Sequence, residues 1–395
     1  MGRPLRIGLS SPYFGSTLGG GEKYLGVAAA ALRDAYPQHH VEIVSPVPAD
    51  RARYERVLDL DLAGIELRSG VQRVTPVHRM VARMPALRPL RNRLVARQAA
   101  LQTAAYDLWL GMVYVIPASS SARRSVMLCQ FPYPLRTAAL RRGVDTFDPI
   151  VCQSEYVRRC VARYWQRDAE VLFPPIDVPT EEPEWGAKRP FILSVGRFVA
   201  GGHNKRHDVL AQAFRDLCDG GLSGWELHLV GTVHQDEASL AYYRRVLEAA
   251  QGYPIHVHAD ASYAELTRLY GQASIYWHAA GYEVDGERRP EDLEHFGMTT
   301  AEAMAHGAVP VVIARGGQPE VVRDGVDGHL WGDLDGLRGR TRELAADPAR
   351  LRALGEAARA SSRRFSREAF RQRLLELLGP IVAELEADAR PTPER

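Results

Sequence analysis

Short apolar runs alternate with longer stretches of helical periodicity along the whole chain of 395 residues. The runs have the length of buried strands, and the stretches between them place apolar residues at the spacing of amphipathic helices. Such alternation is typical of parallel sheets with crossover helices. The predicted strands are residues 5–10, 41–45, 106–112, 125–130, 150–154 and 171–173 in the first half, and 191–196, 225–231, 255–258, 274–278 and 309–313 in the second.

Between the two sets of strands lies a segment with prolines at 174, 175, 179 and 183. Proline fixes φ and lacks an N–H group, so we predict an interdomain linker there. The sequence therefore predicts an α/β protein with two doubly wound, Rossmann-like domains, residues 1–175 and 176–365. A helix at 366–386 and a disordered tail at 387–395 are expected to follow. Ligands of such sheets bind outside the carboxyl ends of the strands, so we expect a deep cleft between the domains to hold the site.

The composition, with 46% hydrophobic and 25% charged residues, fits a soluble globular protein. No apolar run approaches the roughly 20 residues of a membrane-spanning helix. The N-terminus leads directly into the first predicted strand, so we expect no cleavable secretory signal and a cytoplasmic location. The cysteines at 129, 152, 160 and 218 lack paired metal-ligand spacing, so neither a disulfide nor a structural zinc site is expected.

The net charge of +2 hides an asymmetry between the halves. Residues 1–175 hold 24 Lys and Arg against 14 Asp and Glu, a charge of +10, which leaves −8 for the remainder. The first half therefore faces an acidic ligand or the acidic half itself. Eight arginines without any acidic residue lie between 67 and 106, at positions 68, 73, 79, 83, 88, 91, 93 and 97.

The arginine-rich segment, residues 68–97, has two interpretations. One is a solvated basic helical face. The other is docking onto a phosphate-bearing acceptor or onto an anionic membrane, which would place the protein peripherally on the inner face of that membrane. Nucleic-acid binding is not expected, because no recognition helix or aromatic platform accompanies the arginines.

The most informative chemistry lies in Glu294-His-Phe-Gly-Met-Thr-Thr-Ala-Glu302. Gly297 ends a loop, and Thr299 and Thr300 stand where a helix would be capped. The free N–H groups and the positive dipole end of such a helix suit a phosphate group. Glu294 would lie just outside the helix and accept hydrogen bonds from sugar hydroxyls, whereas Glu302, about one turn inside, could accept from a ribose.

Two cations follow the predicted strand at 191–196. Arg197 comes directly after it, and Lys205 opens the next helix after a glycine-containing loop. Taken alone, the two could be ordinary surface cations. A magnesium ion on a diphosphate would need acidic ligands, typically closely spaced aspartates, and no such pattern is evident. Arg197, Lys205 and the helix N-terminus would then hold the diphosphate without a metal.

Four further residues end predicted strands or begin helices. Gly20 and Gly21 belong to a glycine run after the first strand, where the backbone either approaches a ligand closely or simply turns. Gln130 ends the strand at 125–130 and can donate and accept hydrogen bonds without titrating. His278 ends the strand at 274–278, where it either lines a sugar pocket or belongs to the core.

These motifs, in this order, resemble the retaining family 4 glycosyltransferases of the GT-B fold. Glu294 and Glu302 match the E-x7-E pattern of that family, and Arg197 with Lys205 resembles its Gly-Arg-x(n)-Lys element. The resemblance implies that the first glutamate contacts the donor sugar and the second the nucleotide ribose. The implied catalytic residues are Glu294, Arg197 and Lys205, and the implied donor-binding residues are Gly20, Gly21, Phe296, Gly297, Met298, Thr299, Glu302, His278 and Gln130.

The resemblance also implies a function. A sugar would move from a UDP- or GDP-sugar to the hydroxyl of an acceptor, either a small molecule, a glycan or a lipid-linked compound, with retained anomeric configuration and no metal or other cofactor. The C-terminal helix would cross back to the first domain. The family commonly has a histidine where Gln130 stands, a departure that bears on donor identity. The alternatives are a nucleotide-sugar epimerase or hydrolase on the same fold and a non-catalytic nucleotide-sugar binding protein.

Overall fold

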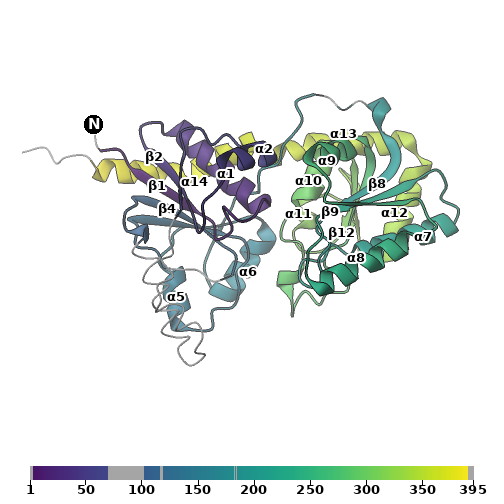
Figure 1. Cartoon of the computed structure of the whole chain (residues 1–395), viewed down its shortest axis with the longest axis horizontal. Coiled ribbons are helices and arrows are strands. Elements are labelled where there is room, and N and C mark those ends of the chain that lie inside the picture. The colour runs from purple at the N-terminus through teal and green to yellow at the C-terminus, as the bar shows by residue number, and fades with distance from the viewer. Residues whose placement is uncertain (1–2, 70–101, 116–118, 182, 184, 390–395) are drawn as a thin grey trace, which may run out of the picture. The chain divides into compact units, whose positions relative to one another are not determined.

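The computed structural model describes residues 3–69, 102–115, 119–181, 183 and 185–389. It divides into two compact units: the N-terminal unit, Met1–Pro175 together with Glu368–Arg395, and the C-terminal unit, Ile176–Arg367. Each unit is built on one parallel sheet with helices on both faces (Figure 1). The α/β class and the two doubly wound sheets predicted from the sequence are confirmed.

The N-terminal unit has a seven-stranded sheet in the order β3-β2-β1-β4-β5-β6-β7. Its neighbouring strands all pair in parallel. The strands are β1 (Arg6–Ser10), β2 (His40–Ser45), β3 (Glu66–Ser69), β4 (Leu108–Val113), β5 (Arg124–Cys129), β6 (Ile150–Cys152) and β7 (Glu170–Val171). The helices between them include α1 (Gly20–Ala35), α2 (Arg51–Leu58), α5 (Ala138–Val144) and α6 (Glu155–Trp165).

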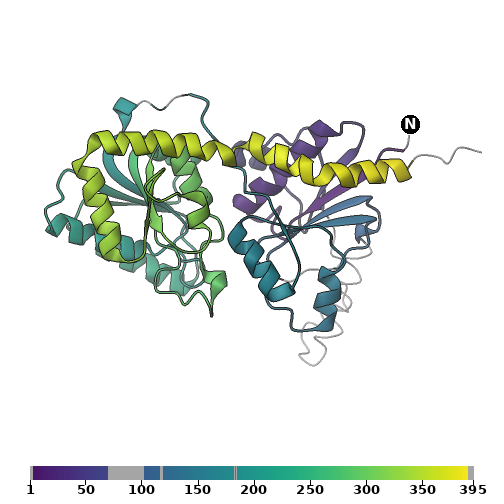
Figure 2. The same ribbon diagram turned by 180° about the vertical axis from the view of Figure 1, so that it is seen from behind.

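The long C-terminal helix α14 (Arg367–Asp388) also packs on the N-terminal unit, as the yellow helix in Figure 2 shows. Its apolar residues recur every three or four positions and therefore share one face of the helix. That face is buried in the same core as strands β1 and β4, through Phe370, Leu374, Leu378, Ile381 and Leu385.

The C-terminal unit has a six-stranded parallel sheet in the order β10-β9-β8-β11-β12-β13. Helices α7 and α8 cover one face and α9 and α10 the other (Figure 1). The strands are β8 (Arg189–Val195), β9 (Glu226–Gly231), β10 (Ile255–Ala259), β11 (Ala273–His278), β12 (Val309–Ile313) and β13 (His329–Trp331). The helices are α7 (His207–Asp219), α8 (Glu237–Ala250), α9 (Tyr263–Gln272), α10 (Met298–Ala305), α11 (Gln318–Val321), α12 (Leu334–Ala346) and α13 (Pro348–Ser362).

Every strand predicted from the apolar runs is present, with its ends within two residues of those predicted. Two further strands, β3 and β13, lie at sheet edges and were not predicted. The sequence of β3 is Glu-Leu-Arg-Ser and most of it is exposed, so it lacks an apolar run. Strand β13 has only three residues, which is too short for any periodicity.

Most of the arginine-rich segment, residues 70–97, lies outside the described residues, so both of its interpretations stay predictions. Arg68, at its start, is on β3 and donates to Glu42 Oε2 at 3.1 Å. None of the helices in the described part of the chain is both long and apolar enough to cross a membrane.

Candidate functional site

The strand order of the C-terminal sheet reverses between β8 and β11, because the chain continues to β9 on one side and to β12 on the other. Ligands of open parallel sheets bind at such a switch point, outside the carboxyl ends of the strands. Arg197 follows the end of β8, and His278 is the last residue of β11. Glu294 lies in the loop that leads from β11 to α10. Three predicted site residues are therefore at the switch point.

Glu294 is at the centre of this site and contacts two basic side chains. Lys205 Nζ donates to Glu294 Oε2, and His278 Nε2 lies 2.9 Å from the same oxygen. The side chains are largely buried, with exposed fractions of 13% for Glu294, 18% for Lys205 and 1% for His278. The structure thus brings together residues that lie 89 positions apart in the chain.

Burial alone would raise the pKa of Glu294, but the Lys205 ammonium and the hydrogen bond from His278 outweigh it and hold the pKa well below its usual value of 4.5. Burial also lowers the pKa of His278, despite the opposing effect of Glu294. Glu294 is therefore a carboxylate beside a neutral imidazole, so Nε2 carries the hydrogen that Glu294 accepts. His278 acts on the site by orienting Glu294, although it is as buried as a core residue.

Lys205 reaches Glu294 because Gly196 leaves room for its aliphatic stem. A side chain on Gly196 would collide with the Lys205 Cγ atom. The ammonium has three hydrogens, and Glu294 takes one of them. The remaining hydrogens leave Lys205 able to bind an anion while it stays paired with Glu294.

Arg197 is exposed and makes no ion pair with any residue in the described ranges. Arg197 lies close enough to His203 to affect the pKa of its imidazole. Burial is the main cause that lowers this pKa, Lys205 and Arg197 lower it further, and Glu294 opposes them. Arg197, Lys205 and Glu294 therefore all lie near His203. Arg197 is the cation of this group whose charge is not neutralised by the described part of the protein.

The helix α10 begins directly after Gly297, which has φ of 108° and ψ of 55°. The prediction that a threonine caps this helix is wrong, because no side chain accepts a hydrogen bond at its N-cap and Thr299 lies inside the first turn. A left-handed conformation at Gly297 allows the chain to enter the helix without a polar cap. The N–H groups of Met298 and Thr299 have no backbone acceptor within the helix, because both residues lie at its start. These two donors are available to an anion.

The Thr299 hydroxyl is held from the neighbouring strand, since the Tyr276 hydroxyl donates to Thr299 Oγ1 at 2.7 Å. Glu302, one turn further along α10, accepts from the Tyr270 hydroxyl at 3.0 Å. The Phe296 side chain is buried and packs edge-on against Phe365 with ring centroids 5.1 Å apart. Any contact of Phe296 with a ligand would therefore come from its backbone.

Two residues at this site were missed in the sequence. Tyr276 lies two residues before His278 on β11, so the period of a strand already places both on one face. Gln318 begins α11 and is fully buried, yet neither its Nε2 nor its Oε1 atom has a partner in the described part of the protein. It packs on Gly297, where an added Cβ atom would lie 2.6 Å from its Nε2 atom. The side-chain amide of Gln318 is therefore available for hydrogen bonding beside the start of α10.

The predicted residues of the N-terminal unit occupy the corresponding edge of its own sheet. Gly20 begins α1, and Gly21 lies so close to the Tyr114 hydroxyl that any side chain would collide with it. Gln130 follows the end of β5, and its carbonyl accepts from Gln153 Nε2 at 3.0 Å. Gly21 thus has a packing role in addition to any role in binding.

A cavity of about 380 Å³ lies at the carboxyl ends of β1, β2 and β4, where the order of the N-terminal sheet reverses. Its described lining combines hydroxyl groups with aromatic and aliphatic side chains and includes no charged residue. Tyr13 and Tyr114 form one wall, with ring centroids 4.7 Å apart and planes at 76°. Other members of the lining are Ser10, Ser11, Ser45, Thr103, Trp109 and Phe147.

Comparison with known proteins agrees with this fold. Residues 178–361 match the family model described as glycosyl transferases group 1. A solved glycosyltransferase structure from Rickettsia africae is similar over 96% of this chain and 99% of that chain, with a TM-score of 0.68 and 17% sequence identity. At this identity the likeness establishes the fold, and the predicted GT-B architecture is confirmed.

Two curated relatives carry the name GDP-Man:Man(3)GlcNAc(2)-PP-Dol alpha-1,2-mannosyltransferase. The protein of Neurospora crassa is 28% identical over 234 residues, which is 54% of this chain and 39% of that protein. The protein of Dictyostelium discoideum is 25% identical over 243 residues, which is 58% of this chain and 45% of that protein. The chain thus matches less than half of the length of either relative.

Proposed function

Because residues 178–361 match the family model described as glycosyl transferases group 1 and the chain has the GT-B fold, we propose that it belongs to that family and transfers a hexose from a nucleoside diphosphate to an acceptor hydroxyl. The observation that carries this proposal is the group at the β8/β11 switch point. There Lys205 and His278 hold an ionised Glu294 beside the start of α10, and Arg197 stays exposed and without an ion pair in the described part of the chain.

The charges of this group suit a diphosphate. Arg197 and Lys205 contribute two positive charges and Glu294 removes one, so the three side chains leave a net charge of +1. The first N–H groups of α10 add the positive end of a helix dipole, equivalent to about half a charge. A donor diphosphate with about two negative charges is therefore nearly neutralised by fixed protein groups, and the reaction needs no metal ion at this site.

The proposed reaction breaks the bond between the anomeric carbon and the diphosphate oxygen while the acceptor oxygen bonds to that carbon. Negative charge then develops on the leaving phosphate, where Arg197, Lys205 and the α10 amides stabilise it. The acceptor proton passes to the leaving phosphate oxygen, so no protein base is required. Glu294 binds the hydroxyls of the sugar, and family membership supports retention of the anomeric configuration.

The donor proposed first is GDP-mannose, because both curated relatives are named for transfer from GDP-Man. A thermal-shift screen of the purified chain against UDP-, GDP- and dTDP-sugars tests the nucleotide and the sugar together. Mass spectrometry of products with hydroxyl-bearing acceptors then tests the transfer itself. If no nucleoside diphosphate sugar stabilises the protein, the proposed function is wrong. Breakdown of the donor that needs no acceptor would indicate a hydrolase.

The cavity of the N-terminal unit is suited to bind an uncharged, sugar-like group of the acceptor. Aromatic faces bind the apolar faces of a sugar ring, and hydroxyl side chains exchange hydrogen bonds with its hydroxyls. A phosphate entering this cavity would find no cation among the described lining residues.

Replacing Tyr13 by alanine tests this role of the cavity. Tyr13 is 42% exposed, so its removal should change the melting temperature little, whereas the acceptor loses one aromatic wall. We expect the KM for the acceptor to rise about tenfold and the KM for the donor to stay unchanged. Tyr263→Ala, which removes a tyrosine that is 49% exposed in the C-terminal unit, is the matched control. An unchanged acceptor KM in Tyr13→Ala would contradict the assignment.

Replacing Glu294 by glutamine should separate sugar binding from nucleotide binding. Glutamine keeps an oxygen for His278 but leaves the Lys205 charge without a counter-ion, so the site becomes more positive. We expect transfer to fall roughly 100-fold, with GDP bound as tightly as by the wild type or more tightly. Calorimetric titration with GDP and with the intact donor measures both affinities. An equal loss of both would show that Glu294 does not recognise the sugar.

A further inference from the structure

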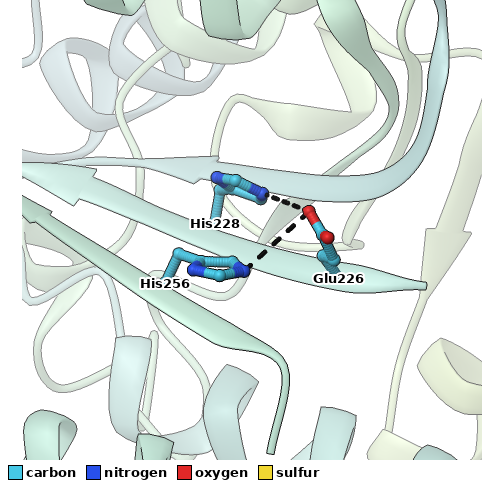
Figure 3. A group of neighbouring side chains, drawn as sticks. All are labelled: Glu226, His228 and His256. Atoms are coloured by element: carbon cyan, nitrogen blue, oxygen red, sulfur yellow. Dashed lines mark hydrogen bonds and ion pairs between the residues drawn. The ribbon is translucent and has the colours of Figure 1, made fainter. Parts of the chain in front are cut away.

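Histidine and glutamate side chains gather on one face of the C-terminal sheet, away from the candidate active site. Glu226 and His228 are two residues apart on β9, and His256 and His258 are two residues apart on the edge strand β10. The register pairs His256 with His228, so all four side chains stand on the same face. Figure 3 shows Glu226, His228 and His256 pointing toward one another from these two strands.

A chain of hydrogen-bonding contacts runs through this group. Glu226 Oε2 lies 3.1 Å from His228 Nε2, His228 Nδ1 lies 3.0 Å from His258 Nε2, and His258 Nδ1 lies 3.1 Å from Glu265 Oε1. The tautomer of each imidazole decides which of its ring nitrogens carries a hydrogen. In one arrangement Glu265 and His258 each accept a hydrogen, which leaves His228 Nε2 with a bare lone pair facing the Glu226 carboxylate.

A cation between Glu226 and His228 would resolve that contact, and a third ligand faces the same position. His256 Nε2 lies 3.9 Å from Glu226 Oε2, and the three ligand atoms all lie within 4.8 Å of one another. Ligands bound to zinc at about 2.0 to 2.1 Å in a tetrahedron lie about 3.3 Å apart. The observed separations need only small side-chain rotations to reach that value.

We propose that Glu226 Oε2, His228 Nε2 and His256 Nε2 bind a divalent transition-metal ion, with zinc as the best match. Two imidazoles and one carboxylate are an established ligand set for zinc and leave a fourth position for water. His228 has the outer partner that metal-binding histidines need, since with the ion on Nε2 its Nδ1 would donate to His258, which Glu265 contacts in turn. Phe191 packs on the His228 ring at 4.3 Å and fixes its plane.

The position of the site indicates its role. Glu226 begins β9 and His256 is the second residue of β10, so the ion lies toward the amino ends of these strands, whereas the candidate active site follows the carboxyl ends. The ion would join the edge strand β10 to β9 and stabilise the C-terminal unit. Arg189 lies 3.7 Å from the same carboxylate, but it is half exposed and can turn toward solvent when the ion binds. The expectation of no structural zinc considered only the cysteines.

Zinc binding by the whole chain tests the proposal, with metal content measured after dialysis and affinity by competition with a chromophoric chelator. We expect His256→Gln to lower the zinc affinity tenfold or more and to abolish the rise in melting temperature that zinc gives the wild type. His256 is about half exposed, so this variant should fold normally. His258→Ala keeps the three ligands and removes the outer partner, and it should weaken binding about 10- to 100-fold.

The matched control is His234→Gln, because His234 Nδ1 also lies near a carboxylate, 3.6 Å from Asp236 Oδ2, but belongs to no group of three ligands among the described residues. This variant should bind zinc as the wild type does. Equal zinc affinity in the wild type and His256→Gln, or no zinc binding by the wild type at micromolar metal, would overturn the proposal. Removal of the zinc by a chelator should leave sugar transfer active, so this test is independent of the proposed function.

Discussion

Replacement of Lys205 by methionine should slow sugar transfer strongly and also destabilise the C-terminal unit. The lost ammonium no longer stabilises the leaving diphosphate, and one charged contact of this kind is worth roughly 1.5 to 3 kcal/mol, so turnover should fall at least about 10- to 100-fold. The buried Glu294 carboxylate is left without its ion pair, which typically costs about 3 to 5 kcal/mol. Steady-state kinetics and thermal unfolding measure the two effects separately.

The double variant Lys205→Met with Glu294→Gln separates these two losses. It removes the unpaired carboxylate together with the ammonium, so much of the lost melting temperature should return. Turnover should stay low, because the diphosphate still lacks a cation. If turnover recovered with the melting temperature, Lys205 would act only by keeping the protein folded.

The pH dependence of stability gives a second check on the same pair. In the wild type the pKa of Glu294 is lowered, so its stabilising effect is present above about pH 4.5 and is lost as the pH falls further. In Lys205→Met the dominant remaining influence is burial, which raises the pKa of Glu294. This variant should therefore become more stable on acidification from neutral pH, because protonation removes the buried charge. The double variant should lose that response.

Central strands such as β4, β11 and β12 could be predicted because their residues are buried on both faces and form continuous apolar runs. Strand β13, His329–Trp331, could not, because three residues at an edge are held by pairing with β12 rather than by a pattern of their own. The start of α10 could be placed within a residue. Its cap could not, since the conformation of Gly297 depends on packing against Gln318, the first residue of the helix α11.

The residues of the site also divide into those that the sequence reveals and those that only the fold brings together. Single motifs marked Arg197, Lys205 and Glu294 because each directly follows or precedes a predictable element. The pairing of Lys205 with Glu294 depends on β8 and β11 being neighbours, which only the strand order provides. The histidine group on β9 and β10 was missed for the same reason. Its residues look like unrelated strand residues until the register sets His256 beside His228.

Replacing Arg197 by methionine should weaken donor binding without loss of stability. Arg197 is exposed and has no ion pair in the described part of the chain, so its removal breaks no protein contact that the structure shows. The donor diphosphate loses one charged contact of roughly 1.5 to 3 kcal/mol, and kcat/KM should fall about 10- to 100-fold. The melting temperature without ligand should stay that of the wild type. Kinetics and calorimetric titration with GDP measure the change.

Salt provides the control that identifies this loss as electrostatic. Ions screen exposed charges, so GDP binding by the wild type should weaken as the salt concentration rises from low to physiological values and beyond. Arg197→Met should respond less steeply, since the exposed charge is gone while the more buried Lys205 remains. Arg244→Met removes another exposed arginine of the C-terminal unit, on α8, and should match the wild type in both affinity and salt response. Equal effects of Arg197→Met and Arg244→Met would mean that GDP responds to the general charge of the unit, and the diphosphate would then have to bind away from the end of β8.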